Sequence, residues 1–382
     1  MRRKLVILVE TYFQQRDYRR YGIEVLQSNG LDVEVWEVFR PWRQSYAENY
    51  RPPDPSGFSG LRHFARTDEI INELGGVGAR DALLVSMSNR WETAPIFRQL
   101  ARQRAYFGAI SLSGIAPTGG RRRFGMGTWR IWRDRFYLRL PHRGRRAAAP
   151  NFILLCGGTS LEPVARRLPK TEPVWTHALD YDIALELGTS ADGRAGQFIV
   201  FLDECVPFHP DYLTMGIAPP NTPGEYYPKL NRFFHSLEER LRLPVVVAAH
   251  PRANYSGGPD YFEGRRVVQG QTGALVRDAA LVITHSSGSN NFTAIYRKPL
   301  LVATTNGLSG SFYGPFIRET AEAYGAQLIN LDEGWNLKAA NILQVDDTRY
   351  ARLVDRFVKR PGTPEKNTWQ ILSNYLNART MA

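Results

Sequence analysis

The feature that most constrains the fold is an alternation of short apolar strands with amphipathic helices, which starts twice along the chain. The first run opens with an apolar stretch at 5–9, a helical pattern over 17–29 and a strand pattern over 31–38. The second run opens at 197–202, after a stretch of linker-like composition over 190–196. Strands that alternate with helices form parallel, doubly wound sheets. The sequence therefore predicts an α/β protein with two open parallel sheets in tandem.

The length agrees with two domains, because 382 residues is about twice a typical domain of roughly 100–200 residues. We predict a Rossmann-like N-terminal domain over 1–190, a Rossmann-like C-terminal domain over 197–360, and a C-terminal helix within 361–382 that packs back on the N-terminal domain. The apolar stretch at 5–9 is shorter than a secretory core of about 7–15 residues or a membrane span of about 18. We therefore expect a chain that stays in the cytoplasm.

Polar residues follow three predicted strands of the second half. Ligands of open α/β sheets bind at the carboxyl ends of the strands, so these residues are the candidates for a binding site. The candidates are Asp203, Glu204, His250, Pro251, Arg252, Ser286, Ser287, Gly288, Ser289 and Asn290.

The turn over 284–290 combines serine hydroxyls with Gly288 directly before a helical pattern. Backbone N–H groups and the helix dipole at such a turn favour an anion. His250 is placed to donate to a phosphate oxygen, and Lys298, just before the next strand, adds a cation. Each element has a structural alternative, because a Ser/Asn-rich turn is often a helix N-cap and a His-Pro pair is often only a turn. Their occurrence on successive strands favours a phosphate site.

Residues 198–305 resemble the C-terminal lobe of bacterial surface-polysaccharide glycosyltransferases, which include bacterial sialyltransferases and the Kdo transferases of capsule synthesis. The resemblance rests on a His-Pro pair at 250–251, the segment TGALVRDAALVITHSS that begins at Thr272, and a Lys-Pro pair at 298–299. It implies the two-lobed GT-B fold, with two Rossmann-like domains that face each other across a cleft. It also implies a CMP-activated acidic sugar as donor, with the phosphate bound by His250, Ser286 and Ser287.

The same resemblance assigns the acidic pair of these enzymes to Asp203 and Glu204. Cys205 stands where a glycine usually follows that pair, and a second His-Pro pair follows at His209. A carboxylate must take the proton of the acceptor hydroxyl, and Glu10, at the end of the first strand, is a third candidate. The N-terminal lobe of such an enzyme usually holds the acceptor, which favours Glu10, and the choice among the three stays open.

The charge on the departing phosphate can be stabilised by His250 and the serine hydroxyls. The expected reaction therefore requires no metal and no other cofactor. Cys156 and Cys205 form neither a disulfide framework nor a Cys/His metal motif.

A cationic segment carries most of the net charge of +12. Residues 121–146 hold ten arginines and one acidic residue, and aromatic residues lie among them. Such a surface suits anionic membrane headgroups, with nucleic acid as the rival partner and a solvated or packed segment as the structural alternative. The residues expected to contact membrane or acceptor are Arg121, Arg122, Arg123, Trp129, Arg130, Trp132 and Arg133.

These observations predict a glycosyltransferase that moves Kdo, sialic acid or a related nonulosonate from a CMP donor to a surface polysaccharide or lipid-linked glycan. The alternatives are a UDP- or GDP-sugar glycosyltransferase, a CDP-polyol phosphotransferase of the same fold, and a scaffold that binds sugar nucleotides without catalysis. We expect the protein to lie on the inner face of the cytoplasmic membrane as a peripheral protein. Its expected partners are a nucleotide sugar, a glycan acceptor and an anionic membrane surface, and not nucleic acid.

Overall fold

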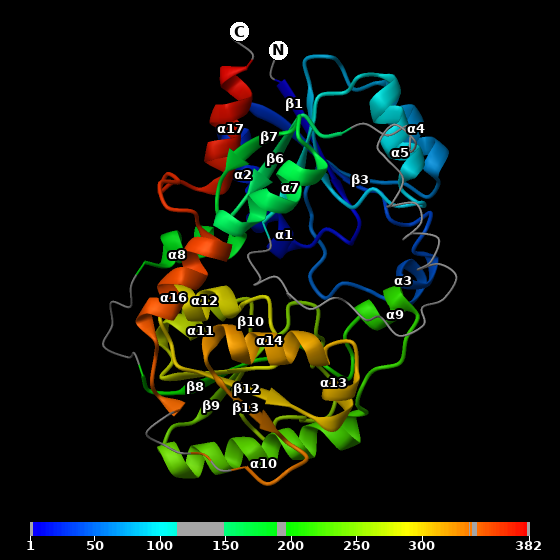
Figure 1. Cartoon of the computed structure of the whole chain (residues 1–382). Helices are drawn as coiled ribbons and strands as arrows, with labels where there is room; N and C mark the ends of the chain where they lie inside the picture. Colours follow the sequence, from blue (N-terminus) through cyan, green and yellow to red (C-terminus); the bar gives the residue numbers. More distant parts are fainter. Residues whose placement is uncertain (1–2, 113–148, 189–195, 336, 338–341, 380–382) are drawn as a thin grey trace. The chain divides into compact units, whose positions relative to one another are not determined.

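The computed structural model describes residues 3–112, 149–188, 196–335, 337 and 342–379, and these residues form two compact α/β units (Figure 1). The described residues of the first unit are 3–112, 149–176 and 362–379, and those of the second lie within 177–361. The first unit is therefore built from both ends of the chain.

The first unit contains a seven-stranded parallel sheet in the order β3-β2-β1-β4-β5-β6-β7. Its strands are β1 (Arg3–Val9), β2 (Leu31–Glu37), β3 (Leu61–His63), β4 (Ala82–Ser86), β5 (Phe107–Ser111), β6 (Phe152–Leu155) and β7 (Glu172–Trp175). The central strand β1 is apolar and buried from Leu5 to Val9 because it has neighbours on both sides. The direction of winding reverses between β1 and β4.

The helices of the first unit are short. They are α1 (Gln15–Arg20), α2 (Ile23–Ser28), α3 (Gln44–Asn49), α4 (Thr67–Gly75), α5 (Ala94–Arg102), α7 (Leu161–Arg167) and α17 (Thr368–Ala378). The single helix predicted over 17–29 is broken at Gly22, whose φ of 52° lies in the left-handed region. A Cβ at this position would lie 2.1 Å from Cδ1 of Trp369. The break therefore makes room for a side chain from the end of the chain.

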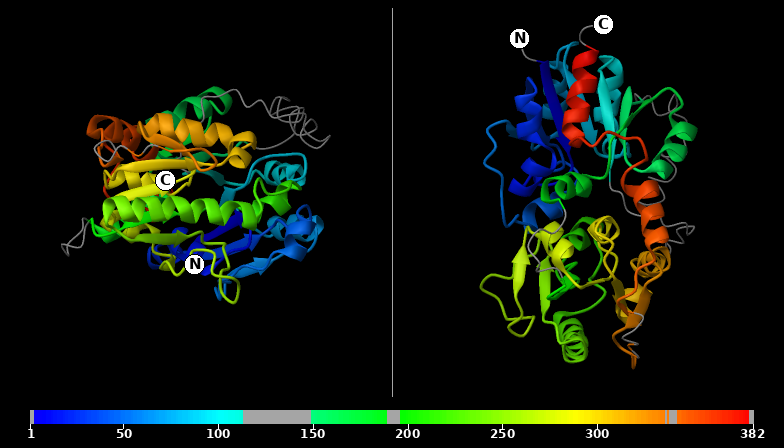
Figure 2. Two further views of the ribbon diagram at one scale, coloured as in Figure 1. Left: turned by 90° about the horizontal axis from the view of Figure 1, so that it is seen from below. Right: turned by 90° about the vertical axis from the view of Figure 1, so that its left-hand side faces the viewer.

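The last helix, α17, packs on the first elements of the chain. The indole Nε1 of Trp369 donates to the carbonyl of Arg20 at 2.8 Å, and the guanidinium of Arg3 donates to the carbonyl of Leu376 at 2.6 Å. This helix, red in Figure 1, lies beside α2 there and beside the N-terminal elements in the right-hand view of Figure 2. Trp369 is fully buried, so α17 forms part of the core of the unit.

The second unit contains a six-stranded parallel sheet in the order β10-β9-β8-β11-β12-β13. Its strands are β8 (Ile199–Leu202), β9 (Val245–Ala249), β10 (Val267–Gln269), β11 (Leu281–Thr284), β12 (Leu300–Thr304) and β13 (Gln327–Asn330). β8, β9, β11 and β12 are buried along their whole lengths. The direction of winding reverses between β8 and β11.

The second unit also contains eight α-helices within the described residues. They are α8 (Leu179–Leu187), α9 (Asp211–Met215), α10 (Pro223–Leu241), α11 (Thr272–Asp278), α12 (Asn290–Ile295), α13 (Asn306–Gly310), α14 (Gly314–Tyr324) and α16 (Asp347–Leu353). The longest, α10, begins with a capping box between Thr222 and Glu225, a signal that fixes a helix start. Its Phe233 and Phe234 are fully buried in the same core as the strands.

The two parallel, doubly wound sheets confirm the predicted fold class. Within the described parts of the chain, no helix combines the length and the apolar character needed to cross a bilayer. Asp203, His250 and Ser286 follow strands of the second sheet at its carboxyl edge, and Glu10 follows β1 at the carboxyl edge of the first.

Candidate functional site

Most predicted site residues of the second unit follow three adjacent strands, two of which flank the point where the strand order reverses. Asp203 and Glu204 directly follow β8, and His285, Ser286 and Ser287 directly follow the adjacent strand β11. The carboxyl edge at such a reversal is where ligands bind in open α/β sheets. His250 follows β9, on the other side of β8.

Asp203 is a buried anchor between the ends of β8 and β9. Its side chain is 3% exposed. One carboxylate oxygen accepts the backbone N–H of Cys205 at 2.8 Å. The other accepts the backbone N–H of His250 at 3.2 Å and the hydroxyl of Tyr255 at 2.8 Å. Burial raises the pKa of Asp203, and the three hydrogen bonds oppose that effect. Asp203 therefore positions the loop that carries His250.

Glu204 reaches in the opposite direction, toward the turn after β11. Its Oε1 accepts the backbone N–H groups of Ser286 at 2.7 Å and His285 at 3.0 Å, and the hydroxyl of Thr284 at 3.4 Å. Burial raises its pKa to about 7, although these donors favour the charged form. The donor groups that the sequence suggested for an external anion thus hold the carboxylate of Glu204 in this structure.

Cys205 shows why a small, permissive residue suits the position after the acidic pair. Its φ is 51°, in the left-handed region that glycine adopts most easily. Before this turn, Asp203 is bonded to the loop after β9 and Glu204 to the loop after β11. Cys205 therefore preserves the conformation that a glycine would give.

The turn at Ser286–Ser287 is closed by its own hydroxyls. Ser287 donates its backbone N–H to Thr284 Oγ1 at 3.1 Å, and its hydroxyl accepts the N–H of Ser289 at 3.2 Å. Gly288 is exposed, and Asn290, the first residue of α12, is buried. The helix that follows has six residues, so its dipole would attract an anion less strongly than the sequence suggested. The argument for an anion site at this turn therefore depends more on the hydroxyl groups.

His285 belongs to the core of the unit. Its Nδ1 lies 2.7 Å from the carbonyl oxygen of Ala303, which can only accept, so this nitrogen carries the hydrogen. Nε2 therefore accepts from the hydroxyl of Tyr226 at 2.7 Å. Burial lowers the pKa of His285, in keeping with a neutral ring.

His250 and Arg252 are bonded to residues of a loop whose role the sequence did not assign. Pro251 lies in the turn between them, and the backbone N–H of Arg252 donates to Nδ1 of His250 at 3.2 Å. The guanidinium of Arg252 pairs with Asp211 at 2.8 Å and reaches His209 at 3.2 Å. The repeated His-Pro pair at His209 was the sequence signal for this loop. No sequence motif of this kind marks Tyr255, whose hydroxyl donates to Asp203.

Lys298 is a prediction that the structure corrects. It precedes β12, and β12 runs parallel to β11, with Leu300 paired to Val282. Lys298 therefore lies at the amino edge of the sheet, whereas the cluster lies at the carboxyl edge, and it does not face the predicted anion. Thr272 begins α11 after the edge strand β10, at the carboxyl edge but two strands away from β8.

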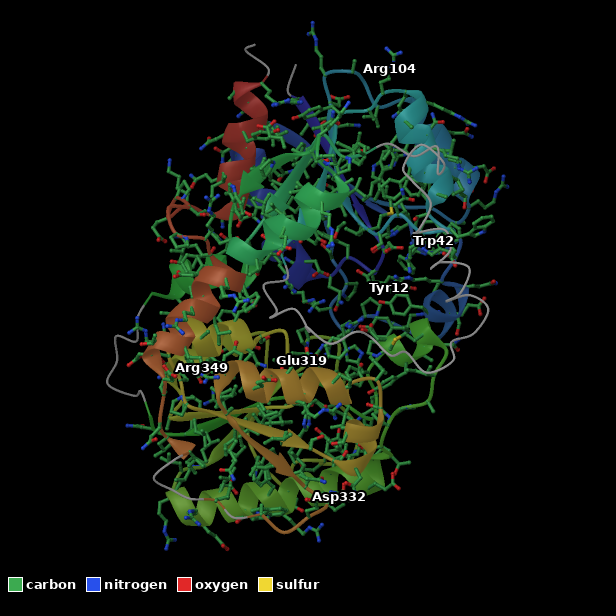
Figure 3. The ribbon with its side chains drawn as sticks, in the orientation of Figure 1. Tyr12, Trp42, Arg104, Glu319, Asp332 and Arg349 are labelled. Carbon is green, nitrogen blue, oxygen red and sulfur yellow. The ribbon has the colours of Figure 1, made fainter. Side chains whose placement is uncertain are left out.

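Glu10 follows β1 in the first unit, at the corresponding reversal of the first sheet. Its carboxylate is bonded to the guanidinium of Arg90, accepts the indole N–H of Trp42 at 3.2 Å, and lies 3.7 Å from the guanidinium of Arg43. Figure 3 labels Trp42 in this unit. Two arginines and an indole thus hold Glu10 in place.

The structure does not test two further predictions, the membrane-binding segment and the independence from metal ions. The basic segment with Arg121, Arg122, Arg123, Trp129, Arg130, Trp132 and Arg133 lies outside the described residues. Among the described residues, no group of three or more His, Cys, Asp or Glu side chains is arranged to hold a metal ion, and the predicted metal independence stays a prediction.

Comparison with known proteins supports the fold. No protein-family model matches the chain, and no curated protein matches its sequence. A putative UDP-N-acetylglucosamine 2-epimerase from Listeria monocytogenes is similar over 100% of this chain and 96% of its own, with a TM-score of 0.53 and 12% identity. The calicheamicin glycosyltransferase CalG4 is similar over 100% of both chains, with a TM-score of 0.53 and 10% identity.

The wall teichoic acid polymerase TagF is also similar, over 100% of this chain and 89% of its own, with a TM-score of 0.53 and 11% identity. Likeness at such low identity concerns the fold alone. The chain therefore has a GT-B-like fold, as the sequence predicted.

Proposed function

We propose that the protein is a glycosyltransferase that takes an acidic sugar, such as Kdo, sialic acid or a related nonulosonate, from a CMP-activated donor. The observation that carries the proposal is that His250, Glu204 and Ser286 follow three adjacent strands, β9, β8 and β11, at the carboxyl edge of the second sheet. Glycosyltransferase and polymerase structures of similar fold support the reaction class. The sequence resemblance supports the CMP donor, with UDP and GDP sugars or a CDP-polyol donor as alternatives.

The donor phosphate would bind at His250 and the Ser286–Ser287 turn. Because Nδ1 of His250 accepts the N–H of Arg252, the hydrogen of the neutral ring lies on Nε2, which can donate to a phosphate oxygen. The serine hydroxyls can turn toward the same anion. Such donors stabilise the charge that forms on the leaving phosphate, and we propose that no metal ion takes part.

For the catalytic base we propose Glu204 ahead of Asp203 and Glu10. A base works best with a pKa close to the working pH, and the pKa of Glu204 is about 7. Both oxygens of Asp203 accept hydrogen bonds of 3.2 Å or less, and Glu10 is held by arginines. Oε2 of Glu204, in contrast, lies 3.4 Å from the hydroxyl of Ser286. Glu204 is bonded to the turn that would hold the donor.

The acceptor would be a surface polysaccharide or a lipid-linked glycan. We propose that the protein works as a peripheral protein on the inner face of the cytoplasmic membrane and that the basic segment at 121–146 contacts anionic lipids. The charge of that segment supports this part of the proposal.

The test is a donor screen. Purified protein is melted with CMP, CDP, UDP, GDP and UDP-N-acetylglucosamine, and donor consumption is then followed by chromatography with and without EDTA. The proposal expects stabilisation by CMP of about 2.7 kcal/mol at a hundredfold excess over its dissociation constant, and turnover that survives EDTA. Preference for a uridine or guanosine nucleotide would replace CMP as the proposed donor nucleotide. If no nucleotide stabilises the protein, the proposal that it is a nucleotide-sugar enzyme is overturned.

A further inference from the structure

A second imidazole, that of His209, lies next to His250. The centroids of the two rings are 4.8 Å apart. His209 lies in the loop between β8 and α9, six residues after Asp203, and its side chain is 12% exposed. Two strand ends thus bring two histidines together at the carboxyl edge of the second sheet.

Both ring nitrogens of His209 face hydrogen-bond donors. The backbone N–H of Asp211 lies 3.1 Å from Nδ1, with the carboxylate of the same residue at 3.6 Å, and the guanidinium of Arg252 lies 3.2 Å from Nε2. Burial lowers the pKa of His209 to about 4, so the ring is neutral at pH 7. A neutral imidazole has one N–H and one acceptor nitrogen. It can therefore accept from one of these two donors and not from both.

The cluster around His209 is therefore rich in N–H groups. Arg252 adds a guanidinium, which forms paired hydrogen bonds with phosphate oxygens. The carboxylate next to it, Asp211, is 45% exposed and accepts from Arg252 at 2.8 Å. An oxyanion has several acceptor sites and no hydrogens, so it is the kind of group that complements this cluster.

We propose that His209 and Arg252 bind a phosphate oxygen beside the one bound at His250, so that two imidazoles and a guanidinium hold the phosphate or diphosphate of the donor. The nucleotide part of this inference rests on the proposed function, and the oxyanion part does not. On binding, the oxyanion accepts from Arg252 and from the ring N–H of His209. The remaining ring nitrogen accepts the N–H of Asp211.

The competing explanation is structural, because Arg252 and Asp211 also join the loops after β9 and β8. Two variants separate the explanations. His209→Ala removes one ligand of the anion, whereas Asp211→Asn breaks the ion pair with Arg252 and removes a negative charge beside the anion. An oxyanion site predicts that the first change weakens binding and that the second leaves it equal or stronger. A structural tie predicts that both weaken binding alike and lower the Tm.

The experiment is isothermal titration of the wild type and both variants with pyrophosphate, CMP and CDP, together with melting curves without ligand. We expect His209→Ala to bind at least one of these ligands about tenfold more weakly or worse, as for the loss of a hydrogen bond to a charged group. If His209→Ala loses affinity for pyrophosphate and CDP but not for CMP, His209 binds the second phosphate. His209→Phe, which keeps a planar ring but has no N–H donor, is used if His209→Ala does not fold.

Unchanged affinities of the His209 variants for all three ligands would overturn the inference. An equal loss of affinity in Asp211→Asn would also overturn it, as would a wild type that binds none of the three ligands. If pyrophosphate binding depends on His209 while no nucleotide binds, the oxyanion site stands and the proposed function fails. If nucleotides bind without dependence on His209, the proposed function stands and this inference fails.

Discussion

The backbone N–H of Ser286 donates to Oε1 of Glu204 over 2.7 Å, and its hydroxyl lies 3.4 Å from the other oxygen of the same carboxylate. This contact joins the loop after β8 to the loop after β11, at the reversal of the second sheet. The turn proposed to bind a phosphate therefore already holds an anion that belongs to the protein. Changes at Glu204 should alter ligand binding, catalysis and stability in separable ways.

The first prediction concerns the nucleotide. His250→Ala, and separately the double change Ser286→Ala and Ser287→Ala, should weaken CMP binding by roughly 1.5–3 kcal/mol, because each removes donors to an anion. Calorimetry measures the effect. Lys298→Gln is the matched control, since Lys298 lies at the opposite edge of the sheet, and its affinity should equal that of the wild type. Normal affinity in both site variants would refute the assignment.

The second prediction concerns the base. Glu204→Gln should lower kcat by about 10²-fold or more, the usual range for loss of a general base, while CMP still binds. Asp203→Asn and Glu10→Gln are measured beside it in the same steady-state assay. If Glu204→Gln keeps a near-normal kcat and one of the other variants loses turnover with the donor still bound, the base is that other carboxylate.

The third prediction concerns pH. The pKa of Glu204 is raised from 4.5 to about 7 in the folded protein, so the folded protein binds this proton more tightly than the unfolded chain. Its contribution to the free energy of unfolding is therefore greatest below about pH 4.5, falls as pH rises toward 7, and then levels off. Glu204→Gln removes this dependence. The Tm of the variant minus that of the wild type should increase between pH 5 and pH 8, and a constant difference would contradict the raised pKa.

The fourth prediction concerns the break between α1 and α2. Gly22→Ala should destabilise the protein by about 2–5 kcal/mol, because it adds left-handed strain to overpacking against Trp369. Gly30→Ala is the matched control, since its φ is 87° and nothing lies within 4 Å of the added Cβ. Urea denaturation of both variants measures the difference. Equal destabilisation would mean that Trp369 does not pack on Gly22.

The fifth prediction concerns the basic segment. The wild type should sediment with anionic vesicles at low salt and be released as salt rises, because headgroup attraction of about 1 kcal/mol per basic residue is screened within about 10 Å at 0.1 M salt. Neutral vesicles should hold the protein poorly. Changing Arg121, Arg122, Arg123, Arg130 and Arg133 to Gln should abolish vesicle binding and spare activity on a soluble acceptor. Loss of that activity with vesicle binding retained would assign the segment to the active site.

The strands and the strand-end residues could be predicted because their signals are local. Apolar runs such as 5–9 and the polar residues after them identify the carboxyl edges of both sheets, and parallel pairing brings Asp203, His250 and Ser286 to one edge. The prediction for Lys298 is wrong because this residue precedes its strand, and the start of a parallel strand lies at the edge of the sheet opposite to the site. The short edge strand Val267–Gln269 was missed because it is partly exposed and has few apolar neighbours.

The partners within the site could not be predicted, because they depend on contacts between distant loops. Glu204 lies more than eighty residues before the turn that it bonds, and no local pattern indicates which donors meet its carboxylate. The same holds for His209, one of whose partners is Arg252, 43 residues further along the chain. Gly22 has the sequence context of a helix interior, and its break is explained by Trp369, near the far end of the chain.

The place of Trp369 over Gly22 also sets an order of events during synthesis. Domains usually fold in the order in which they leave the ribosome. Here the described residues of the second unit, within 177–361, emerge complete before Thr368–Ala378 do. We therefore expect the nascent first unit to wait, with the surface around Gly22 uncovered, until Thr368–Ala378 have been made. A nascent chain that exposes residues up to 361 but not Thr368 would combine a folded second unit with an unfinished first one, in a form that chaperones and proteases can recognise.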